Sequence, residues 1–318
     1  MKYKTIPYVD KKVSQIFYGT ATADFIAGKE ENDLLDAVYD MGINTFDLAR
    51  NYGNAEKSFG LWLDRRQNRD DLVILSKGGH PAPDGEKRLN EREIRKDLAV
   101  STELLHTDYI DIYLLHRDDP EKEAGEFVEI LNALHAEGRI GAFGGSNWTH
   151  RRLEEANEYA YKHSMVPFTV SSPNFGLADQ VADPWGWGCV SISGPENEEA
   201  RKWYRRENMP IIAYSSLAHG FFSGKLKSSD AARESEILDP VAIRGYSSRE
   251  NYERLRRCEE LARKKDAAVP QIAMAWLLSQ DLNTFAVVAS LKRERMEQNI
   301  AALDISLTEE ERNYLDLR

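Results

Sequence analysis

The sequence of 318 residues predicts an α/β fold in which eight parallel strands close into a barrel. Short apolar runs such as INTF and IDIYLL are typical of buried parallel strands, and amphipathic stretches alternate with them along the chain. An ionisable side chain follows several of these runs directly, as Asp47 follows INTF and His116 follows IDIYLL. Because chemistry gathers at the carboxyl ends of barrel strands, the pattern predicts a (β/α)8 TIM barrel with one functional face.

The elements can be placed in order along the chain. The opening TIPYVDKKVSQIFYG alternates weakly around a turn-like VDKK, which predicts a short N-terminal β-hairpin before the first barrel strand. The barrel strands are expected to end near Gly19, Asp47, Lys77, Leu115, Gly145, Ser171, Ser215 and Ala289. Helical periods are expected at 31–41, 55–65, 91–105, 124–137, 149–162, 197–208, 268–280 and 293–303.

Two stretches are too long and irregular to be ordinary connections between a strand and a helix. The first covers 172–196 and contains DPWGWG, and the second covers 217–248 and contains several Gly and Ser residues. Long loops at the catalytic face of a barrel usually hold ligands. We therefore expect both loops to lie at the functional face.

Composition limits the class of protein. The 42 basic and 53 acidic residues give a net charge of −11, which argues against a general nucleic-acid or membrane surface. The length suits one domain spanning residues 1–318. The only cysteines are Cys189 and Cys258, so we expect a reducing, cytoplasmic location without a structural disulfide. The histidines lack metal-ligand spacing, and no metal site is expected. Whether the protein is a monomer or a homo-oligomer stays open.

Four ionisable residues at the predicted strand ends fit one chemistry together. A phenol such as Tyr52 normally holds its proton to about pH 10, but a nearby ammonium such as Lys77 favours the phenolate. Asp47 would keep that lysine charged, and His116 would orient a carbonyl oxygen or donate to it. Tyr52 would then deliver a proton to the oxygen, which is carbonyl reduction. Each residue alone is more often structural, so their joint spacing carries the prediction.

Several motifs together resemble the aldo-keto reductases, namely TFDLARNYG, LSKGG, LLHRDD, GGSNW and AYSSLAHGFFSGK. The resemblance runs from about residue 2 to 303, in the order of the family. It implies that Asp47, Tyr52, Lys77 and His116 form the family's catalytic tetrad. It also implies that Tyr52 is the proton donor to a carbonyl that NADPH reduces, in a reaction that can run in either direction.

The same resemblance implies a set of nucleotide contacts. Ser146 and Asn147 match the pair that holds the nicotinamide carboxamide, and Tyr214 matches the ring on which the nicotinamide stacks. The other matching positions are Ser215, Leu217, Gly220 and Lys225 along the pyrophosphate, Ser290, Lys292 and Arg295 at a 2′-phosphate, and Gln298 and Asn299 at the adenine. Ser172 replaces a glutamine that supports the nicotinamide in many members, and Ala289 replaces a lysine near the adenosine phosphate. NADP(H) is favoured, and use of NAD(H) stays open.

Substrate choice is less well defined by the sequence. Arginine, asparagine and tryptophan side chains fall in loops on the predicted functional face, and those predicted to bind substrate are Arg50, Arg117, Trp148, Asn174, Trp185 and Trp187. Together they would form an aromatic pocket with hydrogen-bonding groups, which suits a small polar aldehyde or ketone such as a sugar derivative. The alternative is that the tryptophans only pack within the loops and that the arginines lie on the solvated surface. A nucleotide-binding regulatory or redox-sensing subunit with little turnover is the alternative function.

Overall fold

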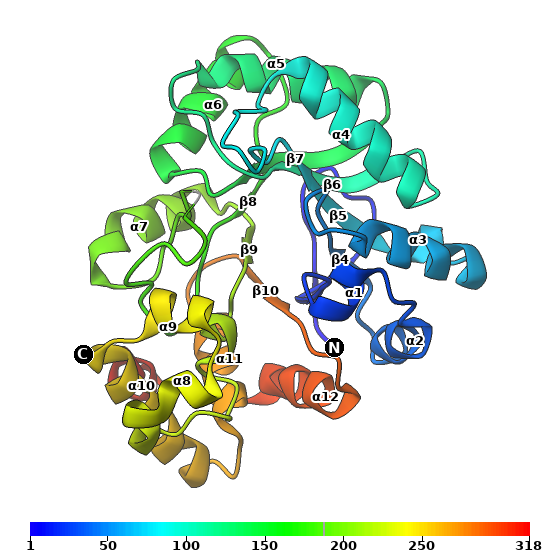
Figure 1. Ribbon diagram of the computed structural model, residues 1–318. Coiled ribbons are helices and arrows are strands. Elements are labelled where there is room, and N and C mark those ends of the chain that lie inside the picture. The colour runs from blue at the N-terminus through cyan, green and yellow to red at the C-terminus, as the bar shows by residue number, and fades with distance from the viewer. Residues whose placement is uncertain (187) are drawn as a thin grey trace. The chain divides into compact units, whose positions relative to one another are not determined.

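The computed structural model describes residues 1–186 and 188–318. Eight strands form a closed barrel in the order β10-β3-β4-β5-β6-β7-β8-β9, which confirms the predicted fold (Figure 1). The strands are β3 (Ile16–Gly19), β4 (Thr45–Asp47), β5 (Val73–Gly78), β6 (Ile110–Leu115), β7 (Ile140–Ser146), β8 (Val170–Ser172), β9 (Ile211–Ala213) and β10 (Thr284–Val288). Each of the neighbouring pairs from β3 to β8 is parallel, as is the pair of β9 and β10.

The N-terminal hairpin is also confirmed. Strands β1 (Tyr3–Lys4) and β2 (Val13–Ser14) pair antiparallel, with Tyr3 opposite Ser14. They form a two-stranded sheet of their own rather than part of the barrel.

The eight predicted helices are present, with ends within a few residues of the expected ones. They are α2 (Asn32–Asp40), α3 (Ala55–Arg66), α4 (Glu91–Leu104), α5 (Ala124–Ala136), α6 (His150–Lys162), α7 (Glu198–Glu207), α11 (Val269–Leu278) and α12 (Arg293–Ala301). The structure adds the helices α1 (Ala23–Ala27), α8 (Glu234–Ile237), α9 (Pro240–Tyr246), α10 (Arg249–Lys264) and α13 (Glu309–Leu315). It also adds the 3-10 turns η1 (Arg69–Asp71), η2 (Pro195–Asn197), η3 (Ala218–Gly220), η4 (Ser228–Arg233) and η5 (Ala302–Asp304).

The longest helix that the sequence reasoning missed is α10. Its first turn is capped by Ser248, whose side chain accepts from the Asn251 N–H at 3.1 Å. Its buried face includes Leu255, Cys258 and Leu261. Most other residues of α10 are charged, so the narrow apolar stripe gives only a weak helical pattern. The serine cap and the spacing of the three buried residues were signals that could have predicted the helix.

The strand ends agree closely with the sequence, and the largest difference has a local cause. β9 ends at Ala213, two residues before the expected Ser215. Ser215 has φ of +52°, in the left-handed region that a strand does not use. The chain therefore turns out of the sheet here.

The chain divides into two compact units, one of residues 1–172 with 289–293 and one of residues 173–288 with 294–318. In the first, α3 to α6 lie outside the strands β4 to β7 (Figure 1). Phe46 of β4 packs ring against ring with Phe59 and Trp62 of α3. In the second, α10 lies against α11. The assignment of residues 1–318 to a single domain stays a prediction. Among the described residues, no helix combines the length and apolarity that a membrane span requires.

Candidate active site

Three of the four candidate catalytic side chains come from neighbouring strands of the first unit. Asp47 ends β4, Lys77 is the second-last residue of β5, and His116 directly follows β6. Because these strands are adjacent and parallel, their carboxyl ends deliver the side chains to the same end of the sheet. Tyr52 lies in the loop between β4 and α3, in a turn where its N–H donates to the carbonyl of Ala49 at 3.0 Å.

The Lys77 ammonium is the centre of the cluster. Its Nζ donates to Oδ1 of Asp47 at 2.5 Å, to the carbonyl oxygen of Leu48 at 2.9 Å and to the phenol oxygen of Tyr52 at 3.3 Å. Lys77 and Asp47 are only 3% and 4% exposed. The structure therefore brings the predicted carboxylate, ammonium and phenol together, with each of the three ammonium protons directed at an acceptor.

The pKa of Tyr52 differs from the expectation. Burial raises it, the Lys77 ammonium lowers it and Asp47 raises it, and the net direction is upward. The expectation that the ammonium brings this pKa below its usual value is therefore wrong for the protein alone, because desolvation outweighs the attraction. The phenol holds its proton at neutral pH, which is the state that a proton donor requires. Lys77 then acts mainly on the phenolate that is left after the proton has moved.

The charges of Lys77 and Asp47 depend on each other. Burial acts to lower the pKa of Lys77, but Asp47 and Tyr52 outweigh it and the net shift is upward. Burial raises the pKa of Asp47, and Lys77 opposes that rise. The pair is charged, with the shared proton on lysine, because a lone charge at either position would be buried without a counter-ion.

The His116 ring is near two other aromatic side chains. Its ring centroid is 5.7 Å from that of Tyr52 and 5.0 Å from that of His80, both edge-on. Burial, and then the positive charges of Lys77 and Arg117, lower its pKa well below the usual value. The ring is therefore neutral at pH 7, and its Nδ1 is buried with no hydrogen-bond partner in the part of the chain that the structure describes. A neutral imidazole can orient a carbonyl oxygen without adding a charge to the site.

Arg50, a predicted substrate contact, is paired within the protein. Its guanidinium donates to Glu56, which is fully buried in α3 and also accepts from the Ser76 hydroxyl at 2.7 Å. The Arg50 N–H donates to the carbonyl of Lys77 at 2.9 Å. These contacts tie the loop that carries Tyr52 to β5, so the structure gives Arg50 a role in holding the loop.

The two residues proposed for the carboxamide lie at the end of β7, where Ser146 is its last residue and Asn147 follows it. The Ser146 hydroxyl donates to the carbonyl of Ser172 at 3.0 Å, and the Asn147 amide donates to the carbonyl of His116 at 3.2 Å. Asn147 has φ of +61°, which asparagine tolerates better than most residues. These hydrogen bonds fix Ser146, Asn147 and Ser172 at the ends of β7 and β8. Asn147 is thereby held close to His116.

Trp148 and Arg117 were both predicted as substrate contacts, and the structure gives them different surroundings. Trp148 is fully buried, packs on Phe127 and Phe168, and donates from its indole N–H to the Arg117 carbonyl at 3.0 Å. It is a core residue, so the prediction that it lines the pocket is corrected. Arg117 is 8% exposed and close enough to His116 and Tyr52 to influence both pKa values. Arg117 remains a candidate for substrate binding.

In the second unit, Asn174 supports other candidate residues. It is 1% exposed, and its amide donates to the Tyr246 hydroxyl at 2.9 Å and to the Tyr214 carbonyl at 3.4 Å. Its side-chain oxygen accepts from Ser191 at 2.9 Å. Asn174 thus supports Tyr214 and Ser191, and its role as a substrate contact stays a prediction. Tyr214 itself is half-buried, as a stacking platform must be.

Trp185 lies on a tight turn in the first long loop. The Asp183 carboxylate accepts four backbone N–H groups, from Trp185, Gly186, Gly188 and Cys189, at 2.8 to 3.0 Å. Burial acts to raise the pKa of Asp183, but these hydrogen bonds outweigh it and lower the pKa to about 2. The turn directs the Trp185 ring to the edge of Tyr214, with centroids 6.0 Å apart. The predicted contact Trp187 lies outside the described residues.

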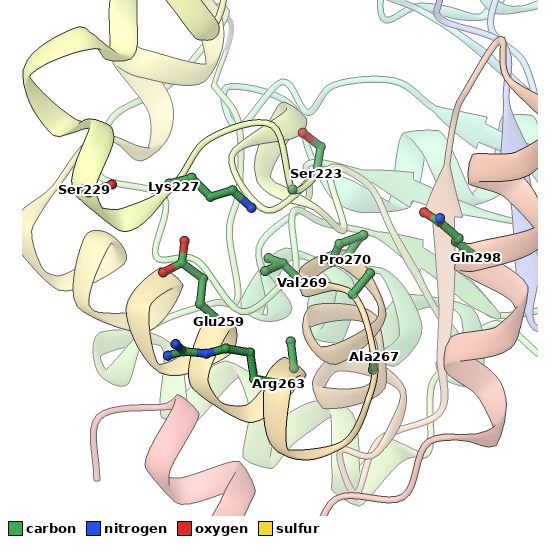
Figure 2. Close-up of a pocket in the computed structure, with 12 residues that line it drawn as sticks. Ser223, Lys227, Ser229, Glu259, Arg263, Ala267, Val269, Pro270 and Gln298 are labelled. Carbon is green, nitrogen blue, oxygen red and sulfur yellow. The ribbon is translucent and has the colours of Figure 1, made fainter.

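The second unit also contains a pocket of about 560 Å³ at the predicted nucleotide loop. Ser223 and Gly224, from the stretch between Gly220 and Lys225, line it together with Gln298 of α12, and Figure 2 shows these parts around one hollow. Ser215, Leu217 and Gly220 are half-exposed, and Lys225 is exposed. The loop is therefore accessible to a ligand.

The C-terminal candidates lie before and along α12. Ser290 is a half-buried and Lys292 an exposed residue of the first unit, and the Ser290 hydroxyl accepts from the Lys292 N–H at 3.1 Å. Arg295 and Gln298 are one helical turn apart on α12. Asn299 is 5% exposed and packs inward, so it is less accessible to an adenine than Gln298.

Sequence reasoning missed His80, whose ring lies beside that of His116, and Glu56, which contacts Arg50 and Ser76 next to the cluster. Glu56 follows Asn54 in an ordinary-looking first turn, and no sequence signal marked its burial. His80 lies three residues after Lys77 and directly after the pair Gly78 and Gly79. Two adjacent glycines indicate a tight turn, and this signal could have placed His80 close to the strand ends. Among the described residues, no group of three or more His, Cys, Asp and Glu side chains could hold a metal ion.

The residues present fit a nicotinamide nucleotide. In the first unit, Ser146 and Asn147 place a hydroxyl and an amide close to His116. In the second unit, Tyr214 offers a half-buried ring, and Gln298 lines the pocket of about 560 Å³. Paired hydroxyl and amide groups suit a carboxamide, and a flat ring suits stacking. The site is thus chemically suited to hydride transfer, which defines the class of protein as an oxidoreductase.

The chain belongs to the aldo/keto reductase family, whose model matches residues 15–317. It is an enzyme, an oxidoreductase of a family that generally uses NAD(P)H and acts on small carbonyl compounds. The expected family resemblance is confirmed over nearly the whole chain.

Three relatives illustrate the range of the family. The aldo-keto reductase str7 of Strobilurus tenacellus is 27% identical over 93% of this chain and 81% of its own length. The L-glyceraldehyde 3-phosphate reductase of Escherichia coli O157:H7 is 25% identical over 91% of this chain and 83% of its own length. A probable voltage-gated potassium channel subunit beta of Oryza sativa subsp. japonica is 25% identical over 96% of this chain and 92% of its own length.

Proposed function

We propose that the protein reduces the carbonyl of a small polar aldehyde or ketone, such as a sugar derivative, to an alcohol with NADPH, reversibly. The observation that supports this best is the contact of the Lys77 ammonium with both Asp47 and the Tyr52 hydroxyl. The two free cysteines are compatible with the cytoplasm as the proposed location.

Each member of the tetrad has a separate task. Tyr52 donates its proton to the carbonyl oxygen as negative charge develops there, and Lys77 stabilises the resulting phenolate. Asp47 keeps Lys77 charged despite its burial. Neutral His116 holds the carbonyl oxygen in line with the phenol. The nicotinamide, when bound, supplies the hydride.

The proposed cofactor contacts are those that the family resemblance implies. Ser146, Asn147 and Ser172 would hold the carboxamide, and Tyr214 would stack on the ring. The remaining proposed contacts are Ser215, Leu217, Gly220 and Lys225 at the pyrophosphate, and Ser290, Lys292, Arg295, Gln298 and Asn299 at the adenosine end. Two cations, Lys292 and Arg295, favour a 2′-phosphate and hence NADP(H), and NAD(H) remains a second proposed cofactor.

The proposed substrate is small and polar. Arg117 is the buried cation near the tetrad, and Trp185 is a half-buried aromatic side chain held beside Tyr214. A buried guanidinium near the tetrad suits a hydroxylated or phosphorylated aldehyde better than an apolar one. The name of one relative, L-glyceraldehyde 3-phosphate reductase, supports the same substrate class.

Replacing the proposed proton donor tests the function. Tyr52→Phe keeps the ring but removes the proton, so we expect kcat with a simple aldehyde to fall by about 100-fold or more. NADPH affinity, measured by fluorescence titration, should stay within about twofold because the ring still fills its place. Unchanged kcat would show that the proton comes from another group.

A regulatory subunit is the second candidate because one relative is named as a potassium channel subunit beta. Such a protein would bind NADPH without appreciable turnover. Assays of wild-type protein with a panel of aldehydes, ketoses and sugar derivatives separate the two proposals. Tight NADPH binding without consumption on any of these compounds would favour the regulatory function.

A further inference from the structure

The predicted nucleotide loop, residues 215–225, has a strained backbone at its start. Ser215, Ala218 and His219 have φ of +52°, +51° and +50°, in the left-handed region that residues other than glycine rarely use. Such angles persist only where neighbouring contacts hold them, and this strain is often found in segments that bind ligands. The contacts that hold the loop therefore bear on how it binds a nucleotide.

Tyr246, the last residue of α9, supports the start of the loop. It is buried, and its hydroxyl accepts a hydrogen bond from the Asn174 amide at 2.9 Å. Burial raises the pKa of this hydroxyl, and side-chain hydrogen bonds with Ser215 and Asn174 act to lower it. The Asn174 amide also donates to the Tyr214 carbonyl at 3.4 Å. Tyr246 is thus joined directly to Ser215 and, through Asn174, to Tyr214.

The other end of α9 contacts the same loop four residues further on. Asp239 caps the helix, and its Oδ1 accepts from the N–H groups of Val241 and Ala242, both at 2.9 Å. Its Oδ2 lies 3.1 Å from Nε2 of His219. The Asp239 and His219 side chains are 50% and 38% exposed, so this contact is the weaker of the two.

Helix α9 can support the loop because it is itself fixed. The Gly245 carbonyl accepts from the Val181 N–H at 2.8 Å, and the Tyr246 carbonyl accepts from the Asn251 amide at 2.8 Å. Asn251 is fully buried in α10. A Cβ on Gly245 would lie 2.7 Å from the Pro184 side chain, so α9 packs closely against the first long loop. The helix is therefore held on the side of α10 and of that loop.

We propose that α9 positions the nucleotide loop for the cofactor, with Tyr246 as the main positioning residue and Asp239 as the second. Tyr246 acts through Ser215 and Asn174 and does not itself touch the nucleotide. A loop that is already ordered loses less conformational freedom on binding, so this support adds to affinity. It serves NADPH and NADH alike, because both carry the pyrophosphate. The inference rests on the proposed reductase function and extends its cofactor site to α9.

Nucleotide affinity separates this role from a general loss of stability. Tyr246→Phe keeps the ring and removes the hydroxyl, and Tyr314→Phe, which removes a hydroxyl that donates to Glu260, is the matched control. Kd for NADPH and NADH is measured by fluorescence titration, beside kcat at saturating NADPH and Tm without nucleotide. We expect Kd for both nucleotides to rise about tenfold in Tyr246→Phe, with kcat within about twofold of wild type. In Tyr314→Phe we expect Kd to be unchanged even if Tm falls.

Asp239→Asn tests the exposed end of α9 without touching a buried hydroxyl. Asparagine caps a helix as well as aspartate does, so the variant loses mainly the carboxylate at His219. We expect Kd for both nucleotides to rise about twofold. Asp281→Asn, which removes an exposed carboxylate 3.2 Å from Arg205, is the control and should leave Kd unchanged.

Glycine at position 215 provides a test that a merely structural role would fail. Ser215→Gly removes the hydrogen bond and adopts a positive φ without strain. If Tyr246 acts through Ser215, adding Tyr246→Phe to Ser215→Gly should raise Kd for NADPH by less than about threefold. A tenfold rise in both backgrounds would overturn the inference, as would an unchanged Kd in both Tyr246→Phe and Asp239→Asn. Wild-type protein that bound neither nucleotide would instead contradict the proposed function, a result that is read before any variant is made.

Discussion

At the scale of single residues, the site depends on burial as much as on charge. Lys77 keeps its charge because Asp47 lies 2.5 Å away, and His116 loses its charge because burial and neighbouring cations act in the same direction. Lys77 is therefore charged and His116 neutral, although both lie at the carboxyl ends of neighbouring strands. The difference comes from the carboxylate, which contacts the lysine and not the histidine.

The neutral state of His116 has a consequence for stability. Its folded-state pKa lies well below the usual unfolded value of about 6.5, so the unfolded chain binds the extra proton as the pH falls below that value. The contribution is fully present above about pH 6.5 and is lost at lower pH, with a slope of up to ~1.4 kcal/mol per pH unit. Urea unfolding between about pH 7 and pH 5 should therefore show a smaller loss for His116→Asn than for wild type.

His80 has a lowered pKa as well and contributes in the same direction in both proteins. His163→Asn, at an exposed histidine, serves as the control and should follow the wild-type pH dependence. If His116→Asn lost stability as steeply as wild type, burial of a neutral His116 would not be the source of the acid sensitivity.

At the scale of elements, the loop that carries Tyr52 depends on helix α3. Glu56 in the first turn of α3 joins Arg50 of the loop to Ser76 of β5. Ser76 precedes Lys77, so the same carboxylate holds the elements that supply the phenol and the ammonium. Their 3.3 Å separation is therefore set by a residue that touches neither.

Glu56→Gln tests this support. The amide keeps the shape but loses the charge that balances Arg50, so we expect the free energy of unfolding to fall by about 1–3 kcal/mol. We expect kcat to fall by roughly tenfold, because a shift of the phenol disturbs proton transfer. NADPH affinity should change little. Glu103→Gln, at an exposed position of α4, is the control, and equal kcat in all three proteins would remove Glu56 from the account.

At the scale of the whole molecule, parallel strands collect residues that are far apart in the sequence. The tetrad comes from three consecutive βα units, whereas the proposed nucleotide contacts extend to α12 near the C-terminus. Cofactor binding should therefore stabilise the protein as a whole, by ~2.7 kcal/mol at a concentration one hundred times Kd.

The adenosine end provides the corresponding test. In the double variant Lys292→Ala with Arg295→Ala, the increase in Tm caused by NADPH should shrink, because two proposed phosphate contacts are lost. The increase caused by NADH should be retained, since NADH has no 2′-phosphate. Arg151→Ala, at an exposed position of α6, should leave both unchanged. If the increase in Tm shrank equally with NADPH and NADH, Lys292 and Arg295 would not be contacts of the 2′-phosphate.

The sequence by itself determined the barrel, the hairpin, the eight predicted helices and the grouping of Asp47, Tyr52, Lys77 and His116. The reason is local, because apolar runs and helical periods are read within short windows and parallel strands place their ends together. The same local reading missed α10, whose apolar stripe is narrow and surrounded by charge.

Only the tertiary structure decided how each polar side chain is used. Arg50 and Asn174 were predicted as substrate contacts by position, and the structure shows them hydrogen-bonded to Glu56 and Tyr246. Trp148 was predicted in the same way but is fully buried, with its indole N–H on the Arg117 carbonyl. The upward pKa shift of Tyr52 likewise follows from burial that no sequence window reports. Hydrogen-bond partners and desolvation are set by residues distant in the chain, so these properties exist only once the chain has folded.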